Sequence, residues 1–194
     1  MLNDRSTPLS LLRTRRSGRP RDLVEPGPGE AELRQMLEIA ARTPDHGKLA
    51  PWRFVIIERA QRSEFQRLLE EAYRADNAAP GRLELESIER FAQQAPTLVV
   101  TLSSPVVPHK IPLWEQELSC GAALMNLLHA AHASGYAAGW VTGWAAFSPH
   151  VLAAFGAPPE RIAGFVFIGT PGVELEERPR PEMARVASAW RPNG

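Results

Sequence analysis

One long apolar stretch within residues 111–143 constrains the fold of this chain more than any other feature. Pro112 and Glu115 are residue types that favour the start of a helix, and Gly135 is typical of the position just past a helix end. The residues between them predict a helix of about 23 residues and about 35 Å, apolar nearly all the way round. A strand at residues 136–142 follows it directly. Such a helix needs cover on all sides, and we expect a second subunit to supply part of it.

Polar residues within this helix limit what it can be. Ser119, Asn126 and two histidines make the apolar run too interrupted and too short for a membrane span. His129 and His132 lie three residues apart and could bind a metal ion, but no carboxylate accompanies them at a fixed spacing. We favour histidines that suit the negative end of the helix dipole. Cys120 is the only cysteine, so an intrachain disulfide and a cysteine-based metal cage are excluded, and no metal site is expected.

The overall composition restricts the possible partners. A length of 194 residues fits a single domain with a substantial core. The 22 basic side chains of Lys and Arg balance the 22 acidic ones of Asp and Glu, so the formal net charge is zero. This balance argues against nucleic acid or an anionic membrane as the main partner. Residues 1–16 carry charges and lack the apolar run of a signal peptide, so we expect a cytoplasmic protein.

Arginines gather at the end of the first predicted helix, residues 8–16. Arg13, Arg15 and Arg16 lie in or beside its last turn, and Ser17 begins the segment that stops it. Because arginine forms paired bonds to phosphate that no other side chain matches, this cluster is a candidate anion site. The residues leave a second interpretation open, in which the cations simply suit the negative end of a helix.

A polar, irregular segment at residues 41–52 follows a predicted amphipathic helix. Prolines and a glycine keep it out of regular structure, so its backbone groups need other partners. Arg42, Asp45, His46 and Lys48 place polar side chains on it. A lone histidine is usually structural, but one on a rigid, charged loop is a candidate site residue.

Predicted strands alternate with predicted helices along the chain. The strands are residues 53–58, 96–102, 136–142 and 162–169, and the further helices are residues 61–74, 83–93 and 148–155. Residues 75–82 read as a mobile segment or lid. We predict an α+β or α/β sandwich in which helices cover both faces of one central sheet. Gly139 and Gly143 suggest that something flat approaches the backbone closely, although a bulge or tight bend explains them equally well.

The chain is predicted to be one domain, residues 1–194, with a tail at residues 172–194. This tail is rich in proline and arginine and carries Trp190 near its end, so we expect it to pack on a partner subunit. Several catalytic signatures are absent from the chain: the Rossmann G-x-G-x-x-G after a strand, a Walker A loop, H-E-x-x-H and G-x-S-x-G. The residues alone therefore indicate an enzyme or binding domain with an anionic ligand near Arg15 and Ser17.

Four segments in order resemble the nitroreductase family of FMN-dependent oxidoreductases. They are Arg15-Arg16-Ser17; Ala41-Arg42-Thr43-Pro44-Asp45-His46 followed by Pro51-Trp52-Arg53-Phe54; Trp114-Glu115-Gln116-Glu117; and Gly139-Trp140 with Gly169-Thr170-Pro171. The Pro-Asp-His and Trp-Glu-Gln-Glu segments are similar to the YdjA-like branch. The resemblance implies a three-layer α+β sandwich with a mixed, mostly antiparallel sheet. It also implies an obligate homodimer that binds two FMN at the subunit interface.

The resemblance assigns positions to the ligands. The FMN phosphate and ribityl end are assigned to Arg15, Arg16 and Ser17. Further FMN contacts are assigned to Arg42, to His46 from the other subunit, and to the strand end Trp140, Val141 and Thr142. A contact region for the nicotinamide nucleotide is assigned to Ala130, Ala131, His132, Ala133, Ser134 and Gly135. No catalytic side chain is implied, because the flavin carries the chemistry.

Some residues depart from the family pattern. Asp45, Lys48 and Ala50 replace serine, asparagine and glutamine, which would change the charge and hydrogen bonds at the flavin pyrimidine edge and so the redox potential and substrate choice. Arg178 and Arg180 are candidates for the late arginine that many relatives place on the phosphate.

The implied reaction is ping-pong. NADH or NADPH reduces FMN, and an electron-poor acceptor such as a nitro compound or a quinone then takes the electrons. Two alternatives stay open: another flavin reaction such as reductive dehalogenation, and a non-catalytic flavin-binding dimer.

Overall fold

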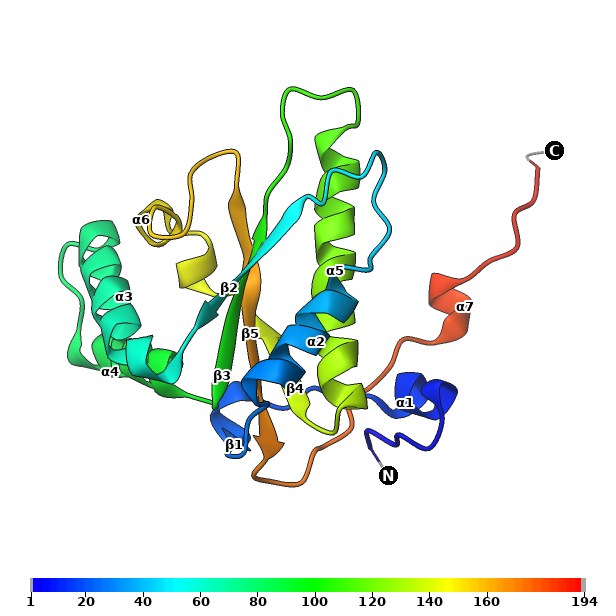
Figure 1. The fold of residues 1–194 in the computed structure, drawn as a ribbon, viewed down its shortest axis with the longest axis horizontal. Helices are drawn as coiled ribbons and strands as arrows, with labels where there is room; N and C mark the ends of the chain where they lie inside the picture. Colours follow the sequence, from blue (N-terminus) through cyan, green and yellow to red (C-terminus); the bar gives the residue numbers. More distant parts are fainter. Residues whose placement is uncertain (1, 193–194) are drawn as a thin grey trace.

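Helices cover both faces of a central five-stranded sheet in the computed structural model of the chain, which describes residues 2–192 (Figure 1). One face carries α2 (Glu30–Ala40) and α5 (Leu113–Ala133), and the other carries α3 (Arg62–Asp76), α4 (Arg82–Gln93) and α6 (Pro149–Leu152). This arrangement confirms the α+β sandwich with three layers that the sequence predicts.

The sheet is built around its longest strand, β5 (Arg161–Pro171). One edge of β5 pairs with β3 (Thr97–Ser103), which in turn pairs with β2 (Trp52–Ile57). The other edge pairs with β4 (Ala137–Val141) and then with the two-residue β1 (Leu23–Val24). All of these pairs are antiparallel. The sequence did not predict β1, because it lies beside a loop rich in proline and glycine.

Alternate residues of the central strands point to the two helical layers. Leu98, Val100 and Phe167 are buried against α3 and α4, whereas Val99 and Val166 are buried against α2 and α5. This alternation follows from the period of two in a strand. Because both faces are covered, the strands read as continuous apolar runs in the sequence rather than as alternating ones.

Helix α5 begins and ends close to the predicted positions. Pro112 precedes its first residue, and Gly135 adopts the left-handed conformation (φ +100°) just past its end. The side that faces the sheet is buried, but the single chain leaves the opposite side open. Trp114 and Leu118 are 67% and 54% exposed, and Ala122, four residues further on, is exposed as well. Among the described helices, α5 included, a membrane-crossing candidate is not found.

His132, near the end of α5, does not serve the helix dipole as a cation, so that interpretation is wrong for this residue. His132 is completely buried, and this burial lowers its pKa to about 4. Burial and the nearby charge of Arg15 also lower the pKa of His129. His132 is therefore uncharged at neutral pH. Within residues 2–192 no group of three or more metal-ligating side chains occurs.

Helix α3 is not the simple surface helix that the sequence predicts, because its first residue is buried. Arg62 is 1% exposed. Its guanidinium donates hydrogen bonds to four main-chain carbonyl oxygens, those of Ile57, Ala92, Gln94 and Pro96, at 2.8 to 3.3 Å. These carbonyls belong to the ends of β2 and α4 and the start of β3, so Arg62 ties three elements together. Burial lowers its pKa to about 10.

The short elements lie at the edges of the sandwich. They are α1 (Pro8–Thr14), η1 (Pro20–Asp22), η2 (Arg59–Gln61), η3 (Trp144–Ala146) and α7 (Met183–Val186). Helix α6 has four residues, fewer than the predicted 148–155, although the predicted cap is present: Ser148 Oγ accepts from Val151 N at 3.3 Å.

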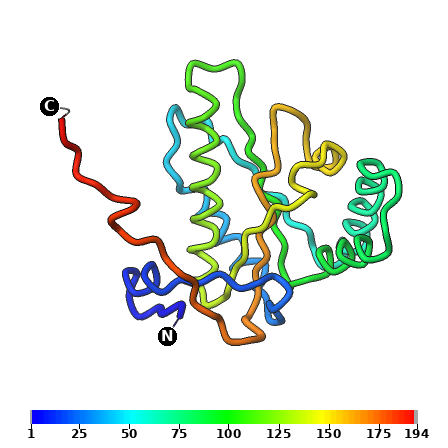
Figure 2. Tube along the Cα trace, turned by 180° about the vertical axis from the view of Figure 1, so that it is seen from behind, coloured from blue at the N-terminus to red at the C-terminus, as the bar shows by residue number. Residues whose placement is uncertain are grey.

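The C-terminal tail leaves the body of the chain after β5. It passes α1 and extends away from the sheet in both views (Figures 1 and 2). Trp190 in this tail is 85% exposed, and Met183 and Val186 of α7 are exposed too. Packing of the tail on a partner subunit stays a prediction.

Candidate functional site

The segment that follows α1 presents the first predicted site residues. Arg15 is the C-cap that follows the last residue of α1, and its N–H donates to Leu11 O at 2.7 Å. The side chain of Asn3 holds both main-chain groups of Arg16: it accepts from Arg16 N at 2.7 Å and donates to Arg16 O at 3.2 Å. The Arg15 guanidinium donates to Ser17 Oγ at 3.2 Å. This part of the backbone is therefore fixed before any ligand arrives.

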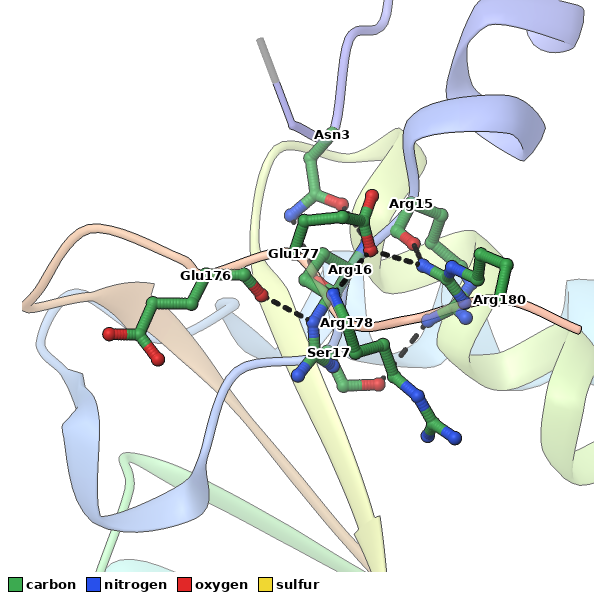
Figure 3. A network of polar contacts seen from close by, with 8 residues as sticks. All are labelled: Asn3, Arg15, Arg16, Ser17, Glu176, Glu177, Arg178 and Arg180. Carbon is green, nitrogen blue, oxygen red and sulfur yellow. Dashed lines mark hydrogen bonds and ion pairs between the residues drawn. The ribbon is translucent and has the colours of Figure 1, made fainter.

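The base of the C-terminal tail returns to this segment (Figure 3). Arg16 Nε donates to Glu176 O at 2.6 Å, and the Arg180 guanidinium donates to Arg15 O at 3.3 Å. Arg178 lies in the same network, and its main-chain N–H donates to Glu177 Oε1 at 2.8 Å. The fold thus brings Arg180 into contact with Arg15 and places Arg178 beside this network. We call Arg15, Arg16, Arg178 and Arg180 the arginine cluster.

The arginine cluster carries more positive charge than its neighbours neutralise. Glu177 pairs with Arg180 at 2.9 Å, whereas the Glu176 carboxylate lies 3.6 Å from Arg19, outside the cluster. Within the described residues, Arg15, Arg16 and Arg178 have no ion pair of their own. Burial, with Arg180 and Arg16 close by, lowers the pKa of Arg15. A phosphate monoester, with a charge of about −1.5 to −2 at neutral pH, would balance this excess.

The predicted strand end lies beside the segment that follows Ser17. A Cβ built on Gly139 of β4 would lie 2.6 Å from Gly18 O, so a larger residue would push the two segments apart. The group that lies close to the backbone at Gly139 is therefore the main chain at Gly18. The Trp140 side chain is bound to the sheet, because its Nε1 donates a hydrogen bond to Ala163 O of β5 at 3.1 Å. Thr142, just past β4, lines a surface hollow with Arg19.

The irregular loop after α2 runs along α5 from just past the middle of the helix toward its start. Asn126 of α5 donates to Thr43 Oγ1 at 2.6 Å, and Ser119 Oγ donates to Pro44 O at 3.2 Å. His46 Nδ1 lies 2.8 Å from a carboxylate oxygen of Glu115, nearer the start of the helix. These contacts hold the loop at successive points along α5. Arg42, at its start, is exposed and has no ion pair within the described residues.

Two predicted flavin contacts lie far apart within one chain. His46 contacts Glu115, whereas Arg15 lies near His129, since its charge lowers the pKa of that imidazole. Positions 115 and 129 of one helix are about 20 Å apart at 1.5 Å per residue. Within one chain these two side chains therefore lie beside opposite parts of α5. The assignment of His46 to the flavin of the other subunit stays a prediction.

The residues that depart from the family pattern shape the loop itself. Asp45 Oδ2 accepts from Ala50 N at 2.7 Å. Lys48 and Ala50 both have positive φ, +57° and +46°, a conformation that costs free energy for residues other than glycine. The Asp45 carboxylate thus closes a strained loop. Sequence reasoning could not detect this role, because it depends on the backbone conformation.

The region that the resemblance assigns to the nicotinamide nucleotide is half enclosed. Ala131 and His132 have no exposed surface, and Ala130 is 3% exposed. Ala133, Ser134 and Gly135 are exposed. Only the last three can touch a ligand at the surface without a rearrangement of α5.

Comparison with known proteins identifies the family of this chain. The model of the family described as "Nitroreductase family" matches residues 12–170. The chain belongs to the nitroreductase family. The putative NAD(P)H nitroreductase YdjA of Escherichia coli K12 is 35% identical over 164 residues, which cover 84% of this chain and 87% of YdjA.

Solved structures of nitroreductase-like proteins share the fold. A nitroreductase-like family protein from Bacillus cereus superposes with a TM-score of 0.78 at 19% identity, covering 95% of this chain and 96% of that one. A putative nitroreductase from Desulfovibrio desulfuricans, solved in complex with FMN, gives a TM-score of 0.70 at 20% identity, with the same coverage of both chains. These likenesses support the nitroreductase fold.

Proposed function

We propose that this chain is an FMN-dependent oxidoreductase that uses NADH or NADPH to reduce electron-poor acceptors such as nitro compounds or quinones. The observation that carries the proposal is the arginine cluster, whose unmatched charge suits a phosphate monoester. Membership of the nitroreductase family and the FMN complex of a protein with the same fold support it. When bound, FMN would accept a hydride from the nucleotide and return two electrons to the acceptor.

The residues of this chain would hold and orient the flavin. Arg15 and Arg16 would pair with the phosphate, and Ser17 Oγ would donate a hydrogen bond to it. Arg180 already contacts Arg15 O and would turn toward the same anion, releasing Glu177. From there the ribityl chain and ring would follow the segment beside β4 to the strand end at Thr142. Trp140 and Val141 would shape that strand end rather than stack on the ring.

We further propose that the active form is a homodimer with FMN at the interface. About 20 Å along α5 separates the helix positions beside which Arg15 and His46 of one chain lie. A second copy would bring its own His46 to the flavin that Arg15 of this chain holds. Trp114, Leu118 and Ala122 form an exposed stripe on α5 that a second copy would cover. Arg42 and the His46 of the partner would then border the ring, and the tail would pack on the partner.

The donor would contact the exposed end of α5. Ala133, Ser134 and Gly135 are accessible there, whereas Ala130, Ala131 and His132 would shape the surface from beneath. We propose this region as the place where the nucleotide rests while it reduces the flavin.

Titration of the flavin-free protein with FMN and with riboflavin tests the phosphate assignment. We expect the double variant Arg15→Gln/Arg16→Gln to bind FMN at least about a hundredfold more weakly, because two charge-assisted contacts are lost. Riboflavin, which lacks the phosphate, should bind the native protein and the variant alike. Arg13→Gln, which changes an exposed arginine of the same helix end, is the matched control.

Anaerobic mixing of the FMN-loaded protein with NADH or NADPH then tests the reaction. We expect bleaching of the flavin band with at least one donor and its return when nitrobenzene or 1,4-benzoquinone is added. A protein that takes up no FMN refutes the proposal, and one that binds FMN but bleaches with neither donor is a binding module.

A further inference from the structure

A carboxylate lies among the guanidiniums of the arginine cluster. It belongs to Glu177, in the segment that follows β5 at residues 173–180, which we call the tail base (Figure 3). Glu177 Oε1 accepts from the Arg180 guanidinium at 2.9 Å and from Arg178 N at 2.8 Å. Sequence analysis did not single out Glu177, because nothing near it in the chain shows that the N-terminal arginines lie beside it.

The charges of Glu177 and of the arginines around it act on one another. The hydrogen bonds from Arg178 N and from the Arg180 guanidinium lower the pKa of Glu177. The charge of Arg16 acts in the same direction. Burial lowers the pKa of Arg15, and the charge of Glu177 opposes that effect. Glu177 is therefore an ionised carboxylate at neutral pH that lies close to both the N-terminal and the late arginines.

Contacts of the main chain hold the tail base over the cluster without help from the Glu177 side chain. Gly172 N donates to Asp22 O at 2.8 Å, just before the tail base begins. Arg16 Nε donates to Glu176 O at 2.6 Å, directly before Glu177. The Glu177 side chain itself is 51% exposed. Its carboxylate can therefore turn out into solvent while the backbone of the tail base stays in place.

A carboxylate and a phosphate compete for the same donors, because a guanidinium forms paired hydrogen bonds with either of them. A carboxylate has one negative charge and two oxygens. A phosphate monoester has a charge of about −1.5 to −2 at neutral pH and offers three oxygens. Among several arginines the anion of higher charge displaces Glu177, whereas an anion that is no stronger than a carboxylate does not.

We propose that Glu177 is an internal competitor for the cofactor phosphate and determines which anions the arginine cluster accepts. A phosphate monoester displaces its carboxylate, whereas carboxylates and other monoanions are excluded because Glu177 already occupies their place. The inference rests on the proposed function, because it takes the bound phosphate to be that of FMN. Glu177 thus lowers the affinity for FMN by a small factor and makes the cluster selective.

Glu176 provides the matched control for Glu177. It lies on the same tail base, one position earlier, but its carboxylate points away from the cluster and lies 3.6 Å from Arg19 (Figure 3). Glu176→Gln therefore removes the same charge from nearly the same place and leaves Glu177 among the arginines. Both substitutions to glutamine keep the size of an exposed side chain, so neither disturbs the core.

Titration of the flavin-free protein with FMN and with riboflavin, at fixed ionic strength, measures the competition. We expect Glu177→Gln to bind FMN about fivefold more tightly than the native protein, because an exposed ion pair no longer has to be broken. Glu176→Gln should bind FMN with the native affinity. Riboflavin, which lacks the phosphate, should bind all three proteins alike.

Two simple anions test the selectivity of the cluster. Replacing part of the chloride in the buffer by acetate should weaken FMN binding in Glu177→Gln but not in the native protein. Inorganic phosphate should raise the midpoint of thermal unfolding, because it binds the folded state, and should raise it further in Glu177→Gln than in the native protein. Glu176→Gln should follow the native protein in both measurements.

The outcomes separate this inference from the proposed function. Equal FMN affinity in the native protein and in Glu177→Gln overturns the inference and leaves the proposed function intact. An equal gain in Glu176→Gln and Glu177→Gln overturns it as well, because the net charge and not the place of the carboxylate would then matter. If no variant takes up FMN, the proposed function is refuted and inorganic phosphate decides the inference. A larger shift of the midpoint in Glu177→Gln then retains Glu177 as the competitor of a phosphate, and an equal shift overturns it.

Discussion

Acidification should destabilise this protein in a pH range that His132 determines. The imidazole is completely buried, and burial lowers its pKa from 6.5 to about 4. The charges of Arg15 and His129 nearby act in the same direction. Neither ring nitrogen has a hydrogen-bond partner within the described residues. The folded state therefore favours the neutral imidazole over the protonated one.

The sign and size of the effect follow from proton linkage. Between pH 6.5 and pH 4 the unfolded chain holds a proton on His132 that the folded chain does not hold, so stability rises with pH across this window. The stabilisation is complete above the unfolded pKa and is lost as the pH falls toward 4. A shift of this size corresponds to about 3 kcal/mol in total, of which about 2 kcal/mol is lost between pH 7 and pH 5.

Urea unfolding of the native protein and of His132→Leu at pH 5, 6 and 7, at one protein concentration, measures this contribution. We expect the loss of unfolding free energy from pH 7 to pH 5 to be about 2 kcal/mol smaller in the variant. His109→Leu, a change in the exposed loop before α5, is the control that keeps His132 in place. Equal pH dependence in the native protein and His132→Leu would refute the reasoning.

Three further substitutions test contacts that the fold creates. Arg62→Met should lower the unfolding free energy by about 3 to 5 kcal/mol, measured in urea, because four carbonyl oxygens, two of them in buried hydrogen bonds, lose their donor. A loss below about 1 kcal/mol would contradict the role of Arg62 in tying the three elements together. Gly139→Ala should lower the free energy of unfolding, measured by thermal denaturation, by about 1 to 3 kcal/mol and weaken FMN binding, since the new methyl group meets Gly18 O. Asp45→Ala should lower the unfolding free energy by about 1 kcal/mol and speed hydrogen exchange at the Ala50 amide, because that amide loses its acceptor. Asp45→Asn keeps an acceptor and should change both quantities little. Equal effects of the two substitutions would rule out the hydrogen bond as the cause.

Local signals in the sequence were sufficient for the main elements. Pro112 and Gly135 set the bounds of α5, and the apolar runs predicted β2, β3, β4 and β5 within a few residues. Helix ends and strand periodicity depend on residues within a turn or two of one another, so they can be read without knowing the fold. The ordered set of short segments was likewise sufficient to identify the nitroreductase family.

The sequence also suggested half of the proposed phosphate site. Arg15, Arg16 and Ser17 stood out because three consecutive polar residues follow a short helix. It could not decide between Arg178 and Arg180, or whether either belonged to the site, since 165 positions separate Arg180 from Arg15 in the chain. That pairing depends on the path of the tail after β5.

Burial was decided by the tertiary structure alone. Arg62 looked like a surface cation and His132 like a helix-end cation, but the packing of α3, α4 and α5 enclosed both. Gly139 left a flat ligand or a bend open in the sequence, and in the fold the main chain at Gly18 lies against it. The sequence determined the helices, strands and family because these rest on local interactions. Which side chains are charged, enclosed or free to meet a ligand rests on contacts between distant segments, and only the folded chain creates these.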